Sequence, residues 1–136
     1  MKIKLNNDSI RFITLFERMT SALVKDCLIS DEKLLFVVSE GQAGVAIGKS
    51  GVNIKNLENV LKRKIEIVEF SNDPLKFLQN ILRPFSLKNI YLSEKSNGRK
   101  AIYFSVQKSS PLLLSKIKKA KPLLARYFTE MELVSQ

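Results

Sequence analysis

The run Gly48-Lys49-Ser50-Gly51 constrains this chain most, because it separates an apolar segment from a periodic one. Before it, residues 34–38 form an apolar run that is typical of a buried strand. After it, apolar residues recur at three- and four-residue spacing over 52–64, which predicts a helix. Glycines let a backbone approach another molecule closely, and N–H groups at a helix start attract anions. The run therefore predicts a loop that faces an anion.

Positive charge is unevenly spread along the 136 residues. The chain carries 23 lysines and arginines against 13 acidic residues, a net charge of +10. Residues 1–70 hold 11 basic and 9 acidic side chains, whereas residues 71–136 hold 12 and 4. A cationic surface attracts polyanions through counterion release without reading their sequence. The charge therefore favours a nucleic-acid partner over a lysine-rich face kept only for solubility.

Composition excludes several classes of protein. A hydrophobic content of 45% is ample for a folded core. A single cysteine and no histidine exclude an internal disulfide and a zinc site of the Cys/His type. That cysteine, Cys27, lies in an expected strand and is predicted to be a small core residue. Short apolar runs and an amino terminus without a signal-like core predict a cytoplasmic protein with no membrane role.

The first half of the chain is expected to alternate helices and strands. Residue patterns and turn signals predict the following elements: a helix at 10–20, strands at 24–29 and 33–39, a short helical segment ending at Ile47, a helix to Lys64 and a strand at 64–70. The order is α-β-β-α-α-β.

The second half is expected to repeat that order. Its predicted elements are a helix that begins at Pro74, with Asp73 as N-cap, and continues over 75–82, strands at 88–94 and 100–107, a helical stretch opened by Ser110-Pro111 that Pro122 interrupts or restarts, and a strand at 130–134. An offset of 66 residues superimposes the two closing strands. We therefore predict a tandem repeat of α/β (α+β) units, 1–70 and 72–136, each a three-stranded sheet packed by helices.

Two other interpretations of the glycine-flanked run have to be weighed. A nucleotide-binding loop of the form G-x-x-x-x-G-K-[ST] needs its first glycine at position 43, which is Ala43. Gly44 is too close, Gly41 is too far, and no apolar strand ends in a magnesium-binding aspartate. Alternatively, the glycines could serve only to allow a tight turn between two helices, with no ligand bound there. That alternative leaves Lys49 and Ser50, which project outward, without a role.

The full run Val-x-Ile-Gly-Lys-Ser-Gly-x-x-Ile-x-x-Leu, at 45–57, resembles the motif of KH domains. In that family a G-x-x-G loop between two helices grips the backbone of about four single-stranded nucleotides. The predicted element order resembles the type II, prokaryotic arrangement. Two adjacent type II units in a small basic chain look most like the archaeal NusA family of transcription termination/antitermination factors. The resemblance covers essentially the whole chain.

The resemblance implies roles for residues in and beside the loop. Gly48 and Gly51 would allow close approach, Lys49 and Ser50 would contact phosphate, and Lys55 would add charge along the path. Ile47 and Ile54 bracket the loop and are expected to bury on the same side, where they would shape an apolar groove for bases. Single-stranded RNA is the implied ligand, because bases must be splayed to reach such a groove.

The second half departs from the family pattern. At the offset of 66 the four loop residues fall on Leu114-Ser115-Lys116-Ile117, which lack glycine. Side chains with a Cβ would hold a phosphate backbone farther away. A basic cluster occupies this region without any acidic residue from 111 to 129; its members are Lys116, Lys118, Lys119, Lys121 and Arg126. We expect this half to attract RNA electrostatically, rather than to be only a solvated helix face, and to clamp it poorly.

The sequence therefore predicts an RNA-binding protein that acts in transcription termination or elongation control. It predicts no enzyme, because no group of side chains suggests catalysis, and no cofactor or metal. RNA polymerase or ribosomal particles are the expected macromolecular partners beside RNA. A ribosome-associated KH protein that binds ribosomal RNA remains the first alternative, and a nucleotide-dependent enzyme the second.

Overall fold

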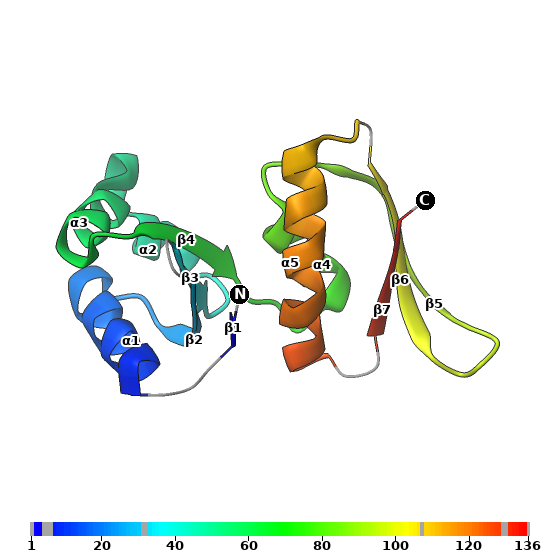
Figure 1. Cartoon of the computed structure of the whole chain (residues 1–136), viewed down its shortest axis with the longest axis horizontal. Coiled ribbons are helices and arrows are strands. Elements are labelled where there is room, and N and C mark those ends of the chain that lie inside the picture. The colour runs from blue at the N-terminus through cyan, green and yellow to red at the C-terminus, as the bar shows by residue number, and fades with distance from the viewer. Residues whose placement is uncertain (1, 4–6, 31–32, 107, 129–130, 136) are drawn as a thin grey trace. The chain divides into compact units, whose positions relative to one another are not determined.

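The chain folds into two compact units. The computed structural model describes residues 2–3, 7–30, 33–106, 108–128 and 131–135. Contacts between residues divide it into Met1–Phe70 and Ser71–Gln136, and Figure 1 shows that each unit combines helices with a small sheet of its own. The mixed α+β class predicted for both units is confirmed.

The first unit follows the predicted order and adds a two-residue strand before it. Its elements are β1 (Lys2–Ile3), α1 (Asn7–Thr20), β2 (Val24–Ile29), β3 (Lys33–Val38), α2 (Ala43–Ile47), the 3₁₀ turn η1 (Lys49–Gly51), α3 (Val52–Leu61) and β4 (Lys64–Glu69). Helix α3 ends earlier than predicted, because Lys62 adopts a left-handed conformation (φ 57°) and its N–H closes the helix on the Glu58 carbonyl.

The sheet of the first unit has the strand order β1-β2-β3-β4. Strand β3 pairs antiparallel with β2 and parallel with β4. Its apolar residues 34–38 are all buried, as expected of a strand with a neighbour on each side. Phe36 of this strand contacts Phe16 of α1, with ring centroids 4.2 Å apart. The core therefore lies between the sheet and the helices.

Helices α2 and α3 are anchored in this core. Ala46 of α2 and Leu57 of α3 are both fully buried. The first N–H of α2, from Ala43, donates to a carboxylate oxygen of Glu69 across 3.1 Å. Both helices are thereby fixed against the sheet, and the residues that join them are held at the surface.

The second unit places its helices on one side of a three-stranded sheet (Figure 1). Its elements are α4 (Pro74–Leu82), β5 (Leu87–Glu94), β6 (Lys100–Val106), α5 (Pro111–Tyr127) and β7 (Met131–Ser135), and its strand order is β5-β6-β7. The predicted strand ends at residues 107 and 130 lie outside the described residues.

Both helix starts of this unit match their predicted signals. Asp73 caps α4 by accepting a hydrogen bond from the Leu75 N–H across 3.0 Å, and Pro74 occupies the first turn. Ser110 caps α5 in the same way, accepting from the Leu113 N–H across 3.2 Å. Short polar side chains at these positions satisfy N–H groups that have no partner within the helix.

The predicted interruption at Pro122 is wrong. Helix α5 is continuous over 17 residues, with Pro122 inside it. A proline within a helix removes one hydrogen bond, but Ala120, Leu123 and Leu124 around it are all buried. This apolar packing outweighs the lost bond. One helix in the second unit therefore covers the sequence that forms α2, the loop and α3 in the first.

Candidate nucleic-acid interface

The loop Gly48–Gly51 combines three residues with positive φ in a stretch of four. The angles are φ 78° and ψ 168° at Gly48, φ 56° at Ser50 and φ 74° at Gly51. The Gly48 conformation lies in a region that only glycine populates readily. The loop shape therefore depends on glycine first of all at position 48.

Asn53 supports the loop from within α3. Its side-chain amide donates a hydrogen bond to the Val45 carbonyl of α2 across 2.9 Å. A Cβ at Gly48 would lie only 2.8 Å from the Asn53 side chain. The missing side chain at 48 thus makes room for the amide that ties the two helices together. Sequence reasoning missed Asn53; the available signal was a hydrogen-bonding side chain in the first turn after the glycines.

Gly51 lies at the N-terminal end of α3. It is the N-cap of the helix and has no side chain to accept from the first N–H groups. Apart from the adjoining backbone and the two neighbouring residues, no described atom lies within 4 Å of the place where its Cβ would be. The start of α3 therefore offers a partial positive charge beside open space, the arrangement in which helix N-termini bind anions.

The remaining residues predicted for the loop region divide between surface and core. Lys49, Ser50 and Lys55 are exposed. Ile54 packs against the core of the first unit, as expected. Ile47 does not bury with it and is 37% exposed. Ile47 is the last residue of α2, next to the loop, and its exposure makes it part of the surface there.

Two valines join Ile47 at this surface. Val45 is 46% exposed and precedes the loop in α2, and Val52 is 47% exposed and follows it in α3. We call Val45, Ile47 and Val52 the apolar rim of the loop. Apolar side chains thus lie on both sides of the exposed Lys49 and Ser50.

The corresponding positions of the second unit form no loop. Residues 114–117 lie inside α5. Leu113, which corresponds to Ile47 at the offset of 66, is 1% exposed and belongs to the core. The Lys116 ammonium donates to the Arg83 carbonyl across 2.6 Å, so this lysine fastens α5 to the end of α4. The second unit thus lacks the glycines of the loop at these positions, and its backbone there is helical.

The other predicted basic residues are distributed around α5. Lys118, Lys121 and Arg126 are exposed, and Lys119 is half-buried. At about 100° per residue, Lys118 and Lys121 lie roughly 60° apart on the helix, whereas Lys119 and Arg126 lie on the flank toward Lys116. The helix is cationic over much of its exposed surface and does not form a single stripe.

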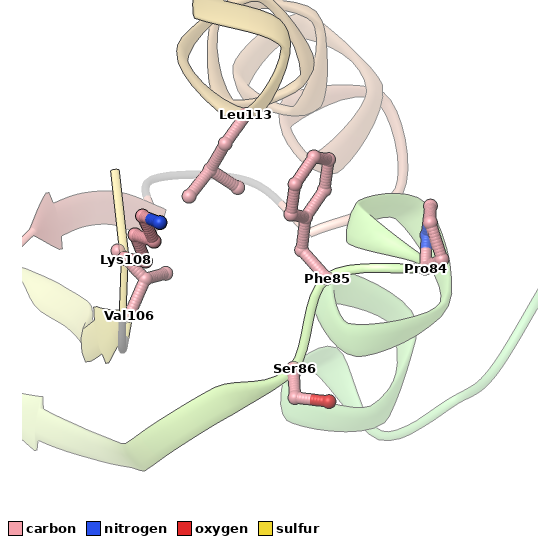
Figure 2. Close-up of a pocket in the computed structure, with 6 residues that line it drawn as sticks. All are labelled: Pro84, Phe85, Ser86, Val106, Lys108 and Leu113. Carbon is pink, nitrogen blue, oxygen red and sulfur yellow. The ribbon is translucent and has the colours of Figure 1, made fainter. Parts of the chain in front are cut away.

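A hollow of about 260 Å³ opens near the start of α5. Figure 2 shows the side chains of Leu113 and Phe85 extending into the same space from α5 and from the segment after α4. Val106 and Lys108, at and just beyond the end of β6, line it as well. In the described part of the chain, no group of three or more acidic, cysteine or histidine side chains could hold a metal ion.

The structure also bears on the nucleotide-binding alternative. Residues Ala43–Ile47 form α2. In a phosphate-binding loop of the G-x-x-x-x-G-K-[ST] type these residues would instead wrap around the phosphates through their backbone N–H groups. A helix at that place leaves no such cradle before Gly48.

Residues 12–95 of the chain match the KH domain family. That match begins within α1 and ends just after β5. This chain belongs to the KH domain family.

Its similarity to archaeal NusA proteins is shown by two curated relatives, each named as a probable transcription termination protein NusA. One, from Methanococcus vannielii, is 44% identical over 97 residues, which are 71% of this chain and 56% of the relative. The other, from Halobacterium salinarum, is 32% identical over 133 residues, which are 94% of each.

The chain thus spans little more than half the length of the Methanococcus vannielii relative and nearly all of the Halobacterium salinarum one. A solved structure agrees with the fold over both KH units. The crystal structure of APE1850 has a TM-score of 0.78 and 28% sequence identity, covering 97% of this chain and all of that one. No helix in the described ranges is long and apolar enough to cross a membrane.

Proposed function

We propose that this NusA-like KH protein binds single-stranded RNA at the loop Gly48–Gly51 and acts in the control of transcription termination or elongation. The loop geometry carries the proposal: three positive φ angles place an exposed lysine and serine at the uncapped start of a helix. Membership of the KH family supports RNA as the anion, because KH loops clamp nucleotide backbones.

The loop suits a sugar-phosphate backbone for physical reasons. Without a Cβ at position 51, a phosphate can come close to the N–H groups at the start of α3. Lys49 and Ser50 supply a cation and a hydroxyl at the same place, and Lys55 lies one turn further along the helix. Contacts to the backbone position RNA but do not read its sequence.

Base contacts fall to the apolar rim. Val45, Ile47 and Val52 present exposed apolar surface next to the loop. Bases in a duplex are stacked and paired, so only unpaired bases can turn onto such a surface. Ile54, packed against the core, would form the floor of this groove and hold α3 in place. Single-stranded RNA therefore suits this site better than duplex.

The second unit contributes charge in this proposal. Lys118, Lys121 and Arg126 on the exposed side of α5, with Lys119 beside them, attract phosphate without a clamp. Lys116 belongs to the same cluster but is engaged with the Arg83 carbonyl, so we assign it a smaller share. The unit 1–70 would thus grip the RNA backbone, and the unit 72–136 would attract RNA by its charge.

The link to transcription rests on the relatives, which are named as probable transcription termination proteins. RNA polymerase is the partner that this role implies. Capture of native complexes on the intact chain, followed by identification of bound RNA and protein, separates the alternatives. Recovery of polymerase subunits with nascent transcripts supports the proposal, whereas ribosomal particles with ribosomal RNA would favour a structural RNA binder.

RNA binding at the loop is tested by a matched pair of variants. Gly51→Asp places a carboxylate where a phosphate would lie, and Gly51→Asn places a neutral side chain of nearly the same shape there. Both residues tolerate positive φ better than most, so both variants are expected to fold. We expect Gly51→Asp to abolish most binding to single-stranded RNA and Gly51→Asn to keep much more. Equal affinity in both variants and the unaltered chain would refute the site.

A further inference from the structure

A pair of stacked tyrosines lies on the sheet of the second unit. Tyr91 of β5 is directly opposite Tyr103 of β6 in the antiparallel register. The ring centroids are 5.2 Å apart and the ring planes differ by 12°. Tyr91 is 45% exposed. An aromatic pair is therefore presented at the surface of the more basic unit.

Register and burial place this pair on the face of the sheet away from the helices. Ile102 and Phe104, on either side of Tyr103 in β6, are fully buried. Figure 1 shows α4 and α5 together on one side of the sheet. Because successive side chains of a strand point to opposite faces, Tyr103 points to the other side, and its cross-strand neighbour Tyr91 shares that face. The tyrosines thus do not belong to the core beneath the helices.

Polar and cationic groups flank the rings along the same face. On one side the Asn89 amide donates to the Ser105 hydroxyl across 3.3 Å. On the other side Glu132 of β7, opposite Ala101 in the register, binds both Lys95 and Arg99 of the β5–β6 hairpin. The hydrogen bond from Lys95 lowers the pKa of Glu132 and raises that of Lys95. Both shifts favour the charged forms of Glu132 and Lys95. The cluster thus sets two basic side chains against one carboxylate.

We propose that this tyrosine face, formed by Asn89, Tyr91, Tyr103 and Ser105 with the hairpin cations beside it, is a second contact site for single-stranded RNA, on which unpaired bases stack. Aromatic side chains bind bases of any sequence, because every base has a π-face. Residues 71–136 hold 12 basic and 4 acidic side chains, and this positive charge complements a phosphate backbone. The proposal rests on the proposed function in one respect: RNA is the ligand of both sites.

The tyrosine content of the chain offers a direct probe. The protein has three tyrosines and no tryptophan. The third, Tyr127, contacts Phe77 with ring centroids 5.7 Å apart and serves as an internal control. The intact chain is labelled with 3-fluorotyrosine, and its three ¹⁹F signals are assigned with single Tyr→Phe variants. We expect a single-stranded RNA of about 12 nucleotides, three times the roughly four that a KH loop grips, to shift the signals of Tyr91 and Tyr103 more than that of Tyr127.

Affinity gives a second, independent measurement. Tyr91→Ala should weaken binding of the long RNA by about tenfold, whereas Tyr91→Phe keeps the aromatic face and should bind normally. Neither change should affect a four-nucleotide RNA that fills only the loop. Unshifted signals on RNA addition, or equal affinity of Tyr91→Ala and the unaltered chain, would overturn the proposal. Signals that move only when purified RNA polymerase is added would overturn it in favour of a protein-docking face.

The Gly51→Asp variant separates this proposal from the function of the loop. If both sites bind RNA, the variant loses tight binding but its tyrosine signals still shift at high RNA concentration. If only the tyrosine face is wrong, the loop variant loses binding and the tyrosine signals never move. If only the loop is wrong, Gly51→Asp binds normally and the signals shift as in the unaltered chain.

Discussion

The Asn53 side-chain amide lies against the Gly48 backbone, only 2.8 Å from the position that a Cβ at residue 48 would take. From there it donates to the Val45 carbonyl across 2.9 Å. The same contact therefore fixes the angle between α2 and α3 and requires glycine between them. The loop is held by a side chain that need not touch RNA.

This contact predicts how substitutions at Gly48 and Asn53 combine. Gly48→Ala should lower the free energy of unfolding by about 1–3 kcal/mol, because it forces a non-glycine residue into this backbone conformation and against the amide. In an Asn53→Ala background the loss should be smaller, since the side-chain part of the clash is gone while the backbone strain remains. Urea unfolding of the four proteins measures the coupling.

Gly44→Ala is the matched control for that cycle. Gly44 lies in α2 and has no positive φ, and apart from its chain neighbours and the backbone of its own helix no described atom lies within 4 Å of its Cβ position. Alanine there should stabilise the protein by roughly 0.5–1 kcal/mol, because glycine within a helix is unfavourable. Additive effects of Gly48→Ala and Asn53→Ala would argue against the coupling.

The apolar rim predicts a loss of affinity without a loss of stability. Ile47→Ser should weaken binding of single-stranded RNA by about tenfold, since it removes apolar surface on which a base would rest. Ile47 is already 37% exposed, so the substitution should change the free energy of unfolding of the protein only slightly. Val60→Ser, on α3 but two turns beyond the loop and 58% exposed, is the control that should bind normally. Fluorescence anisotropy with labelled RNA measures the affinity of both variants.

The lysines of α5 should separate into two kinds. Replacing Lys118 and Lys121 by Ala should weaken binding evenly across RNA sequences and reduce the salt slope of log K by about 1.4, or roughly 0.7 for each phosphate contact with a single strand. Lys116→Ala should instead lower stability by about 1 kcal/mol, because its ammonium holds the Arg83 carbonyl. A change in sequence preference after the double substitution would contradict a purely electrostatic role.

Cys27 should be inert in the folded protein. Burial, and then the neighbouring Asp26 charge, raise the pKa of its thiol from 9.0 to about 12. A raised pKa favours the neutral thiol in the folded state, so this stabilisation is complete below pH 9 and is lost as pH rises from 9 toward 12. The difference in unfolding free energy between the unaltered chain and Cys27→Ala should shrink over that range. Thiol reagents should react at the rate of unfolding.

Local patterns were sufficient to predict most of the fold. The apolar run 34–38 identified the buried strand β3, and Asp73-Pro74 and Ser110-Pro111 marked two helix starts correctly. The error at Pro122 has a tertiary cause. A proline signal describes the backbone alone, whereas burial of Ala120, Leu123 and Leu124 decided the outcome.

Within the candidate site, sequence identified the glycine loop but not what supports it or what surrounds it. Spacing could not show that Ile47 stays at the surface while Ile54 joins the core, because both sit at apolar positions of adjoining helices. Asn53 and the Tyr91–Tyr103 pair depend on contacts between elements, which a linear pattern does not contain. The roles of the loop residues and of the basic residues on α5 stay predictions.

The unbroken course of α5 sets a limit on redesign. Glycines introduced at 114 and 117 would not create a second grip, because the surrounding backbone is helical and each would weaken the helix by about 1 kcal/mol. The turn in the first unit needs left-handed residues and a bracing amide at 53, whose counterpart at the offset of 66 is Lys119. An engineer who wanted two clamps would have to transplant the whole α2–α3 segment, and with it a new set of core contacts.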